Sequence, residues 1–174
     1  GKKGTEVILT VIRGGKREPL EIKIIRDTIA IPTIDTEFQQ NTTTLTDAEG
    51  KPTGLQENGV FVIKLYSFSA TSPDLFRYAL RAFIESHSNK LVLDLRGNPG
   101  GYLEVAVSMA SWFLPTGTVI VSEDFGKNGS PVVYRSKGYN VFNKNLKFAI
   151  LVNNGSASAS EILAGALQEH GKAT

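Results

Sequence analysis

The sequence predicts an α/β fold in which helices flank a mainly parallel β-sheet. From Gly59 onward, apolar runs of strand length alternate with stretches of helical periodicity, a pattern typical of parallel sheets. The strand candidates at residues 59–66, 90–95 and 147–152 are almost continuously apolar, as expected for strands buried on both faces. The last two lead into turns rich in small residues, and each turn is followed by a helical pattern.

The composition excludes several classes of function. Of the 174 residues, 41% are hydrophobic, and 19 basic against 17 acidic residues give a net charge of +2. This balance gives no reason to expect nucleic acid or a membrane surface as a partner. No run approaches the roughly 18 apolar residues of a membrane span. Because cysteine is absent, disulfide scaffolds, thiolate zinc sites and cysteine nucleophiles are excluded.

The first part of the chain, residues 1–34, contains two predicted strands. Residues 5–13 and 19–26 are rich in Val and Ile, and a Gly-Gly pair between them is a turn signal. Two strands alone do not make a stable domain, so this hairpin is either the end of another domain or an edge of the main one. Residues 35–58 are polar and predict a linker or an edge segment, with the threonine run 42–44 suited to an edge strand.

Residues 59–174 form the predicted main domain. After its first strand, Ser72 fits the N-cap of a helix, Pro73 its first position and Asp74 its first turn. Apolar residues then recur at spacings of three and four, which gives this helix one buried stripe. We expect further helices at 102–114 and 158–170, and further strands near 117–122 and 131–135.

A glycine-rich turn follows the strand at 90–95. The run DLRGNPGG, residues 94–101, contains three glycines, so its backbone can approach another group closely. Because a helix begins directly after it, amide N–H groups point out of this turn and could hold a phosphate or an oxyanion. The turn matches neither a P-loop nor a dinucleotide fingerprint, and we expect no metal and no cofactor. The local residues leave open a turn that only connects two elements.

A second turn of small residues joins the strand at 147–152 to the last helix. It reads NNGSASASE over residues 153–161 and leaves room for a substrate backbone. A serine here lies at the positive end of a helix, which favours negative charge developing on a reacting oxygen. Ser158 with Glu161 is equally a capping box, which stabilises helix starts in proteins of every function. By itself, this local pattern favours capping over catalysis.

Together, the two turns resemble those of the carboxyl-terminal processing peptidases, S41-type serine endopeptidases of bacterial envelopes and plastids. The resemblance rests on LVLDLRGNPGGYLEVAV and, further along the chain, on AILVNNGSASASEILAGALQEHG. The segment GVFVIKLYSFSATSPDLFRYAL resembles the start of the protease core. More weakly, residues 1–34 resemble the closing strands of the PDZ module that precedes this core. The resemblance implies a ClpP/crotonase-like peptidase core over residues 59–174, truncated at its C-terminus.

The resemblance also implies roles for residues of the two turns. Ser158, three residues before a glutamate, matches the family's nucleophile, which forms an acyl-enzyme with the substrate. The amides of Ala159 and Gly101 match the two donors of its oxyanion hole. Arg96 and Asn98 match the motif as residues that brace the turn. The rival hydroxyls in the same segment are those of Ser156 and Ser160.

In this family the general base is a lysine, kept neutral by an apolar pocket and placed beyond the helix that follows the serine. The sequence ends at Thr174, before that position, so we expect these 174 residues alone to be inactive. Lys172 and His170 lie at the far end of the helix, about 21 and about 18 Å from Ser158 at the helical rise per residue. His87 fits a surface histidine at a helix end, and nothing places a histidine beside Asp94.

Three functions stay open at this level. The first is an endopeptidase of the cell envelope or periplasm that cuts unfolded or C-terminally exposed proteins through an acyl-enzyme on Ser158. The second is a non-catalytic scaffold or binding protein, although a degenerate site would be free to fill with larger side chains. The third is a crotonase-like enzyme acting on thioesters, which would tolerate Ser158→Ala. We expect protein or peptide substrates and homo-oligomers, no nucleic acid and no membrane span, and no peptide binding by residues 1–34 alone.

Overall fold

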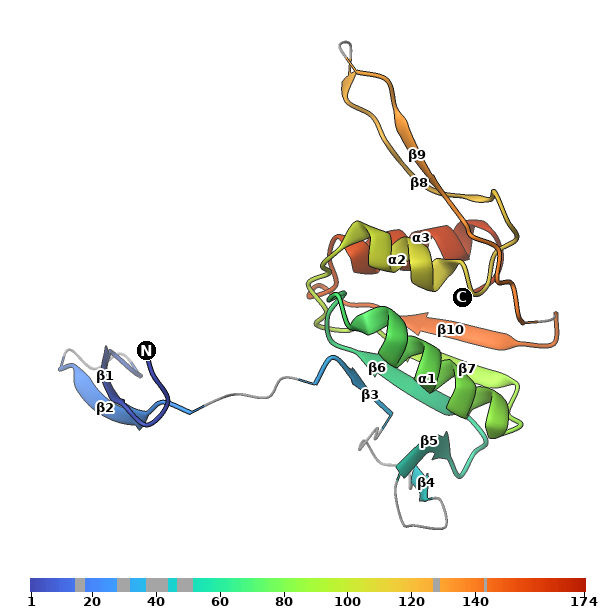
Figure 1. Cartoon of the computed structure of the whole chain (residues 1–174). Coiled ribbons are helices and arrows are strands. Elements are labelled where there is room, and N and C mark those ends of the chain that lie inside the picture. The colour runs from blue at the N-terminus through green and yellow to red at the C-terminus, as the bar shows by residue number, and fades with distance from the viewer. Residues whose placement is uncertain (15–17, 28–31, 37–43, 47–51, 127–128, 143) are drawn as a thin grey trace. The chain divides into compact units, whose positions relative to one another are not determined.

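A computed structural model gives the fold of the chain. It describes residues 1–14, 18–27, 32–36, 44–46, 52–126, 129–142 and 144–174. The chain divides into two compact units, Gly1–Ile31 and Pro32–Thr174 (Figure 1). Within the described ranges, no helix combines the length and the apolar character needed to cross a membrane.

The first unit contains a two-stranded antiparallel sheet. β1 (Glu6–Val11) pairs with β2 (Leu20–Ile25), both where the Val- and Ile-rich segments predict strands. Arg26 closes the open end of this hairpin, because its Nη1 donates a hydrogen bond of 2.9 Å to Thr5 Oγ1. Several apolar side chains of the two strands are exposed, Ile25 most of all.

The second unit is built on a mixed sheet whose longest pairings are parallel. β7 (Lys90–Asp94) lies between β6 (Phe61–Leu65) and β10 (Lys147–Leu151), and both neighbours run parallel to it. These three strands are the ones predicted from continuous apolar runs. The prediction of an α/β fold with a mainly parallel sheet is therefore confirmed for the centre of the unit.

Shorter antiparallel strands extend this sheet on one side. β3 (Ile34–Asp35) pairs with the end of β6, and β5 (Pro52–Gln56) joins β6 to β4 (Thr44–Thr46). Residues 35–58, for which we expected a linker or an edge segment, thus contribute strands to the edge of the sheet. Threonines 42 and 43 lie outside the described residues, so the structure does not test the edge strand predicted for them.

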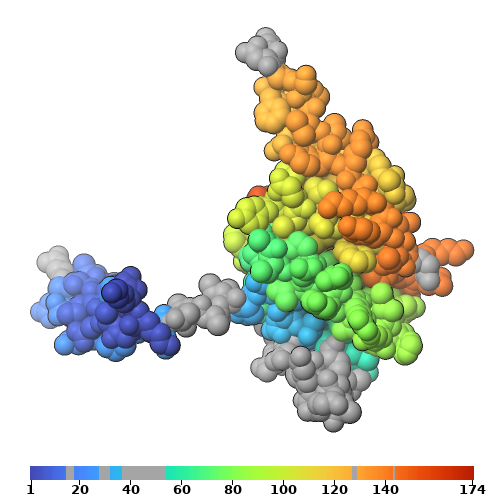
Figure 2. Space-filling view, viewed as in Figure 1, coloured from blue at the N-terminus to red at the C-terminus, as the bar shows by residue number. Residues whose placement is uncertain are grey.

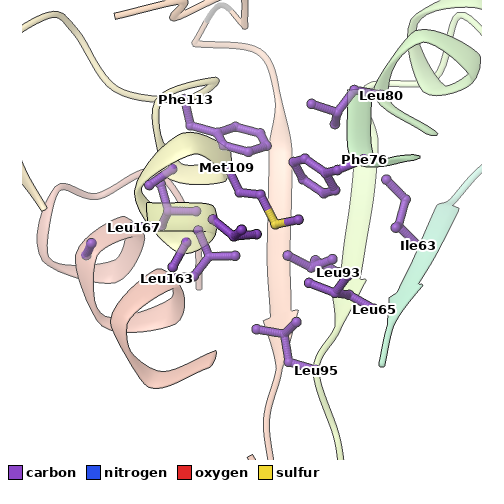
Figure 3. Packing of buried hydrophobic residues seen from close by; sticks show 14 of the residues in the cluster. Ile63, Leu65, Phe76, Leu80, Leu93, Leu95, Met109, Phe113, Leu163 and Leu167 are labelled. Atoms are coloured by element: carbon purple, nitrogen blue, oxygen red, sulfur yellow. The ribbon is translucent and has the colours of Figure 1, made fainter. Parts of the chain in front are cut away.

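Helices α1 (Ser72–Glu85), α2 (Leu103–Ala110) and α3 (Ala159–Glu169) pack with the sheet around one hydrophobic core. Figure 3 shows side chains of α2 and α3 meeting those of β6 and β7 in this core. Its fully buried members include four phenylalanines and the aliphatic residues that face them: Phe61, Phe68, Phe76, Phe83, Ile63, Leu65, Leu80, Leu91, Leu93, Leu95, Met109 and Leu114.

The start of α1 differs from the prediction. Ser72 is not the N-cap but the first helical residue, because Thr71 already has a helical backbone (φ −88°, ψ −14°) and makes no side-chain cap. The Ser72 hydroxyl is buried and holds the preceding loop instead. It donates to Ser67 O at 2.8 Å and accepts from Ser69 N at 2.8 Å. Pro73 stands within the first turn, as predicted.

The end of α2 also differs from the prediction, whereas the two strands that follow lie near the predicted positions. α2 stops at Ala110, since Trp112 N and Phe113 N bond to carbonyls three residues back, the tighter spacing of a turn. β8 (Val119–Glu123) and β9 (Val132–Arg135) form a separate antiparallel sheet and do not join the parallel one. In Figure 2 this two-stranded sheet, coloured orange, projects from the body of the second unit.

Candidate active site

The two turns singled out from the sequence meet at the carboxyl edge of the parallel sheet. Asp94 at the end of β7 pairs with Leu151 at the end of β10, so the chain leaves both strands side by side. A hydrogen bond of 2.9 Å from Leu95 N to Leu151 O continues this pairing beyond the strands. Ligands of open α/β sheets bind at this edge. We call residues 95–101 the glycine turn and residues 152–158 the serine turn.

Asn98 joins the two turns from within the protein. Its side chain is fully buried, and its Nδ2 donates to Leu65 O at 2.9 Å while its Oδ1 accepts from Gly100 N at 2.9 Å. Its backbone carbonyl accepts from the other turn, from Ala157 N at 3.1 Å and from Ser160 Oγ at 3.0 Å. These bonds fit the bracing role that the sequence motif implied for Asn98.

The rival serines both use their hydroxyls to hold the backbone. Ser156 Oγ donates to Leu95 O at 2.8 Å and accepts from Asn153 N at 3.0 Å. Ser160 is fully buried, and its hydroxyl donates to Asn98 O. Ser158, in contrast, is exposed. This arrangement favours Ser158 as the hydroxyl free to meet a substrate.

Ser158 has an unusual backbone conformation. Its φ is 54° and its ψ is −116°, a region that residues with a Cβ seldom adopt because of steric conflict. The two residues of the capping box are in place, and Ser158 N donates a hydrogen bond to Glu161 Oε2 at 2.8 Å. The reciprocal contact, from the backbone N–H of Glu161 to the Ser158 hydroxyl, is too weak to count as a side-chain cap hydrogen bond. A strained serine on a strand-to-helix turn is the geometry of a nucleophile elbow.

Gly100 brings the glycine turn into direct contact with Ser158. Its φ is 97°, and a Cβ at this position would lie 2.6 Å from Ala157 O, 2.8 Å from Ser158 Cβ and 2.9 Å from Ala159 N. Any larger residue would push the two turns apart. Gly101, which follows, pairs with Phe68, and a Cβ on it would overlap the Phe68 carbonyl.

Two backbone amides at this contact lack internal partners. The neighbouring amides are occupied: Ser158 N bonds Glu161, Ser160 N bonds Ala157 O, and Gly100 N bonds Asn98. Over the described residues, neither Gly101 N nor Ala159 N donates a hydrogen bond within the protein. A Cβ placed on Gly100, the residue before Gly101, would lie 2.9 Å from Ala159 N. Two free donors beside an exposed serine are the elements of an oxyanion hole.

Residues 59–174, which include both turns, match the family model described as "Peptidase family S41". This chain belongs to peptidase family S41. The "Probable CtpA-like serine protease" of Staphylococcus epidermidis is 36% identical over 176 residues, which cover 99% of the S41 chain and 31% of that protein. The "Carboxy-terminal processing protease CtpA" of Bacillus subtilis is 34% identical over 169 residues, which cover 97% of the chain and 32% of that protein. The chain therefore spans about a third of the length of these relatives.

Solved structures show the same fold. The S41 chain superposes on a photosystem II D1 C-terminal processing protease with a TM-score of 0.66 at 23% identity, over 99% of this chain and 43% of the other. A putative S41 protease from Bacteroides fragilis gives a TM-score of 0.55 at 19% identity, over 94% and 43% of the two chains. At such identities the likeness shows the α/β fold alone.

A buried ionic cluster lies under the glycine turn of the S41 chain. The Asp94 carboxylate has no exposed area and accepts from Arg96 Nε at 3.0 Å and Arg96 Nη2 at 2.8 Å. Lys64 Nζ lies 3.2 Å from Asp94 Oδ1 and donates to Arg96 O at 2.7 Å. Burial raises the pKa of Asp94, but the hydrogen bonds from Arg96 and the Lys64 charge outweigh it and hold that pKa below its usual range.

The described residues place no free base beside Ser158. His170 lies at the far end of α3, where its Nε2 pairs with Val119 O at 2.8 Å. Lys172 follows it, and His87 lies exposed just beyond α1. Lys64 Nζ is already engaged, since it pairs with the Asp94 carboxylate and donates to Arg96 O.

Sequence reasoning missed Lys64 and the close approach of Gly100. Lys64 carried a signal, because it is the single charge within an apolar strand, and a buried charge needs a partner. Gly100 carried a weaker signal. The family motif led us to assign the role of oxyanion donor to its neighbour Gly101, and Gly100 received no role. The contact between Gly100 and Ser158 joins segments far apart in sequence, and local pattern does not contain it.

Proposed function

We propose that this chain supplies the nucleophile and the oxyanion hole of a serine-type endopeptidase that cleaves proteins or their C-terminal regions. The observation that carries the proposal is Ser158, exposed and held at positive φ beside two amide N–H groups that have no acceptor among the residues that the structure describes. A serine that only caps a helix requires neither the strain nor the free amides. The relatives that are named as proteases support the same function.

In the proposed reaction, Ser158 Oγ attacks the carbonyl carbon of the scissile peptide bond, and its proton passes to a general base. The carbonyl oxygen becomes an oxyanion that accepts hydrogen bonds from Gly101 N and Ala159 N. When the intermediate collapses, the C–N bond breaks, the base gives its proton to the departing amine, and an ester remains on Ser158. Water, deprotonated by the same base, attacks the ester, releases the new carboxyl terminus and restores the hydroxyl.

The proposed base is a neutral lysine, as the family resemblance implies. The described lysines and histidines do not fit the role, because Lys64 is paired with a carboxylate and His170 lies at the far end of α3. We therefore propose that a polypeptide of residues 1–174 alone turns over no peptide. If this polypeptide did cleave peptides, and if Ser158→Ala abolished that cleavage, this part of the proposal would be wrong.

Further parts of the proposal concern the rest of the protein. We propose that residues 1–34 are the closing strands of a PDZ module and that residues 59–174 are a ClpP/crotonase-like core. Two strands without a core of their own fit part of a larger module. From the same resemblance we propose action in the cell envelope or periplasm, on proteins that are unfolded or have an exposed C-terminus. Fractionation of cells that make the natural full-length protein tests the location.

The deciding experiment compares the natural full-length protein with its Ser158→Ala variant on an unfolded protein substrate. We expect cleavage by the first and none by the second, with an acyl or fluorophosphonate adduct mapped to Ser158 by mass spectrometry. Equal cleavage by both would reject Ser158 as the nucleophile. Substrate binding without cleavage by either would favour the non-catalytic scaffold, and thioester turnover retained in Ser158→Ala would favour a crotonase-like enzyme.

A further inference from the structure

Lys64 is a charged residue within the central, most buried part of the sheet. It lies in β6 between two aspartates of the neighbouring strands, paired in register with Asp35 of β3 and with Asp94 of β7. Successive side chains of a strand point to opposite faces, so Lys64 points away from the core in which Ile63 and Leu65 are packed. Only 15% of its side chain is exposed.

The Lys64 ammonium reaches the backbone of the glycine turn. It donates to Arg96 O at 2.7 Å and lies 3.2 Å from Asp94 Oδ1. The next residue of the same strand, Leu65, accepts from Asn98 Nδ2 at 2.9 Å. β6 therefore holds the glycine turn at two points, one on each side of Gly97, and both points come before Gly100 in the chain.

Stability alone does not account for this ionic cluster. Replacing all members of a buried ionic cluster by apolar side chains of similar volume is often neutral or stabilising, so apolar residues at these positions would serve a purely structural sheet at least as well. What an apolar residue cannot supply is a donor to the Arg96 carbonyl. That bond limits how the turn from Leu95 to Gly101 can rotate about the end of β7.

We propose that Lys64 is a positioning residue of the peptidase reaction: its ammonium bridges Asp94 and the Arg96 carbonyl and so sets the direction of the Gly101 amide toward the oxyanion. The inference rests on the proposed function, because it gives Lys64 a role in an oxyanion hole. Lys64 itself touches neither the substrate nor Ser158 in this role.

The test measures kcat and KM of the natural full-length protein on a fluorogenic peptide, with Lys64→Met, Lys64→Arg and Lys147→Met. Lys147 is the matched control, an exposed lysine at the other end of a strand in the same sheet. Since oxyanion donors act in the transition state, we expect Lys64→Met to lower kcat by about ten- to a hundredfold with KM within about twofold. Lys64→Arg, which keeps a cationic donor, is expected to retain most of kcat, and Lys147→Met all of it.

A peptide aldehyde gives a second readout that does not depend on turnover. Its adduct with Ser158 carries an oxyanion, whereas the matching peptide alcohol forms none. We expect Lys64→Met to weaken aldehyde binding about tenfold while leaving alcohol binding unchanged. Equal weakening of both ligands, or an unchanged kcat in a folded Lys64→Met protein, would overturn the inference. Loss of all activity in Ser158→Ala alongside a normal Lys64→Met would reject the inference and leave the proposed function standing.

Should Lys64→Met fail to fold, the double variant Lys64→Met/Asp94→Asn removes the negative charge of Asp94 together with the ammonium. The inference expects kcat to stay low in this double variant, because the bond to Arg96 O is still missing. Recovery of the original kcat would mean that Lys64 only neutralises Asp94, and would overturn it.

Discussion

Gly100 and Ser158 lie so close together that a single methyl group on the glycine would lie 2.8 Å from Ser158 Cβ. Gly100 also has φ 97°, which a residue with a Cβ adopts only with strain. We therefore expect Gly100→Ala to lower the free energy of unfolding by about 1–3 kcal/mol and to separate the two turns. A displacement of this kind should reduce kcat by about a hundredfold or more. Urea unfolding and peptide hydrolysis measure the two effects.

Gly165 provides the control for that substitution. It lies within α3, and a Cβ built there meets no atom within 4 Å. Gly165→Ala should raise the free energy of unfolding by about 0.5–1 kcal/mol, since alanine favours the helix over glycine, and should leave hydrolysis unchanged. If both alanine variants behaved alike, the contact between Gly100 and the serine turn would not be responsible.

The positive φ of Ser158 predicts a conflict between stability and activity. Ser158→Gly removes the Cβ that makes this conformation unfavourable, and glycine costs little at an N-cap. We expect the variant to gain about 1 kcal/mol in the free energy of unfolding while losing hydrolysis altogether. Thermal or urea unfolding measures the gain. A loss of stability would show that the Ser158 side chain holds the helix start and is not strained.

The neighbouring serines should respond in the opposite direction. Ser160 is buried and its hydroxyl donates to Asn98 O, so Ser160→Ala removes a buried hydrogen bond. We expect a loss of about 1 kcal/mol in the free energy of unfolding, with hydrolysis largely retained. Ser156→Ala should behave similarly, because Ser156 Oγ donates to Leu95 O. Fluorophosphonate labelling of either variant at Ser158 would confirm that the nucleophile is intact.

Asn98 is expected to be the most sensitive polar residue of the site. Asn98→Ala leaves Leu65 O and Gly100 N buried without a partner, which costs about 2 kcal/mol or more in the free energy of unfolding. Exposed Asn58, whose Oδ1 accepts from Val60 N at 3.1 Å, is the matched control, and Asn58→Ala should cost less than about 1 kcal/mol. Equal costs would mean that water replaces the Asn98 side chain.

Much of this fold could be predicted because its signals are local. The strands β6, β7 and β10 are continuous apolar runs, and a run of this kind specifies a buried strand without reference to the rest of the chain. The antiparallel strands β3 and β5 could not be predicted in the same way. β3 has only two residues, and β5 contains a proline and a glycine, so neither has a strand pattern of its own. Their pairing is decided by the free edge that β6 offers.

The site, like the fold, was predictable only where its signals are local. Ser158, Gly101 and Ala159 could be proposed from motifs that lie within short segments. The sequence could not show whether Ser158 only caps α3, because a capping box and a nucleophile elbow share the same residues. The distinction lies in φ of Ser158 and in the contact with Gly100, and both arise only when β7 and β10 become neighbours.

The buried carboxylate of Asp94 predicts how stability depends on pH. Its folded-state pKa lies below the unfolded value of about 3.9, so ionised Asp94 stabilises the fold above that pH, and the contribution is lost as the pH falls through the folded-state pKa. Asp94→Asn should therefore cost about 3 kcal/mol at pH 7, because it breaks a buried pair, and progressively less below about pH 4. Urea unfolding of both proteins between pH 7 and pH 3 measures the difference.

Asp74→Asn is the control, since the pair of Asp74 with Arg77 is exposed and should contribute less than about 1 kcal/mol at any pH. A difference between Asp94→Asn and the original protein that stayed constant down to pH 3 would show that the carboxylate is held by packing and not by its charge.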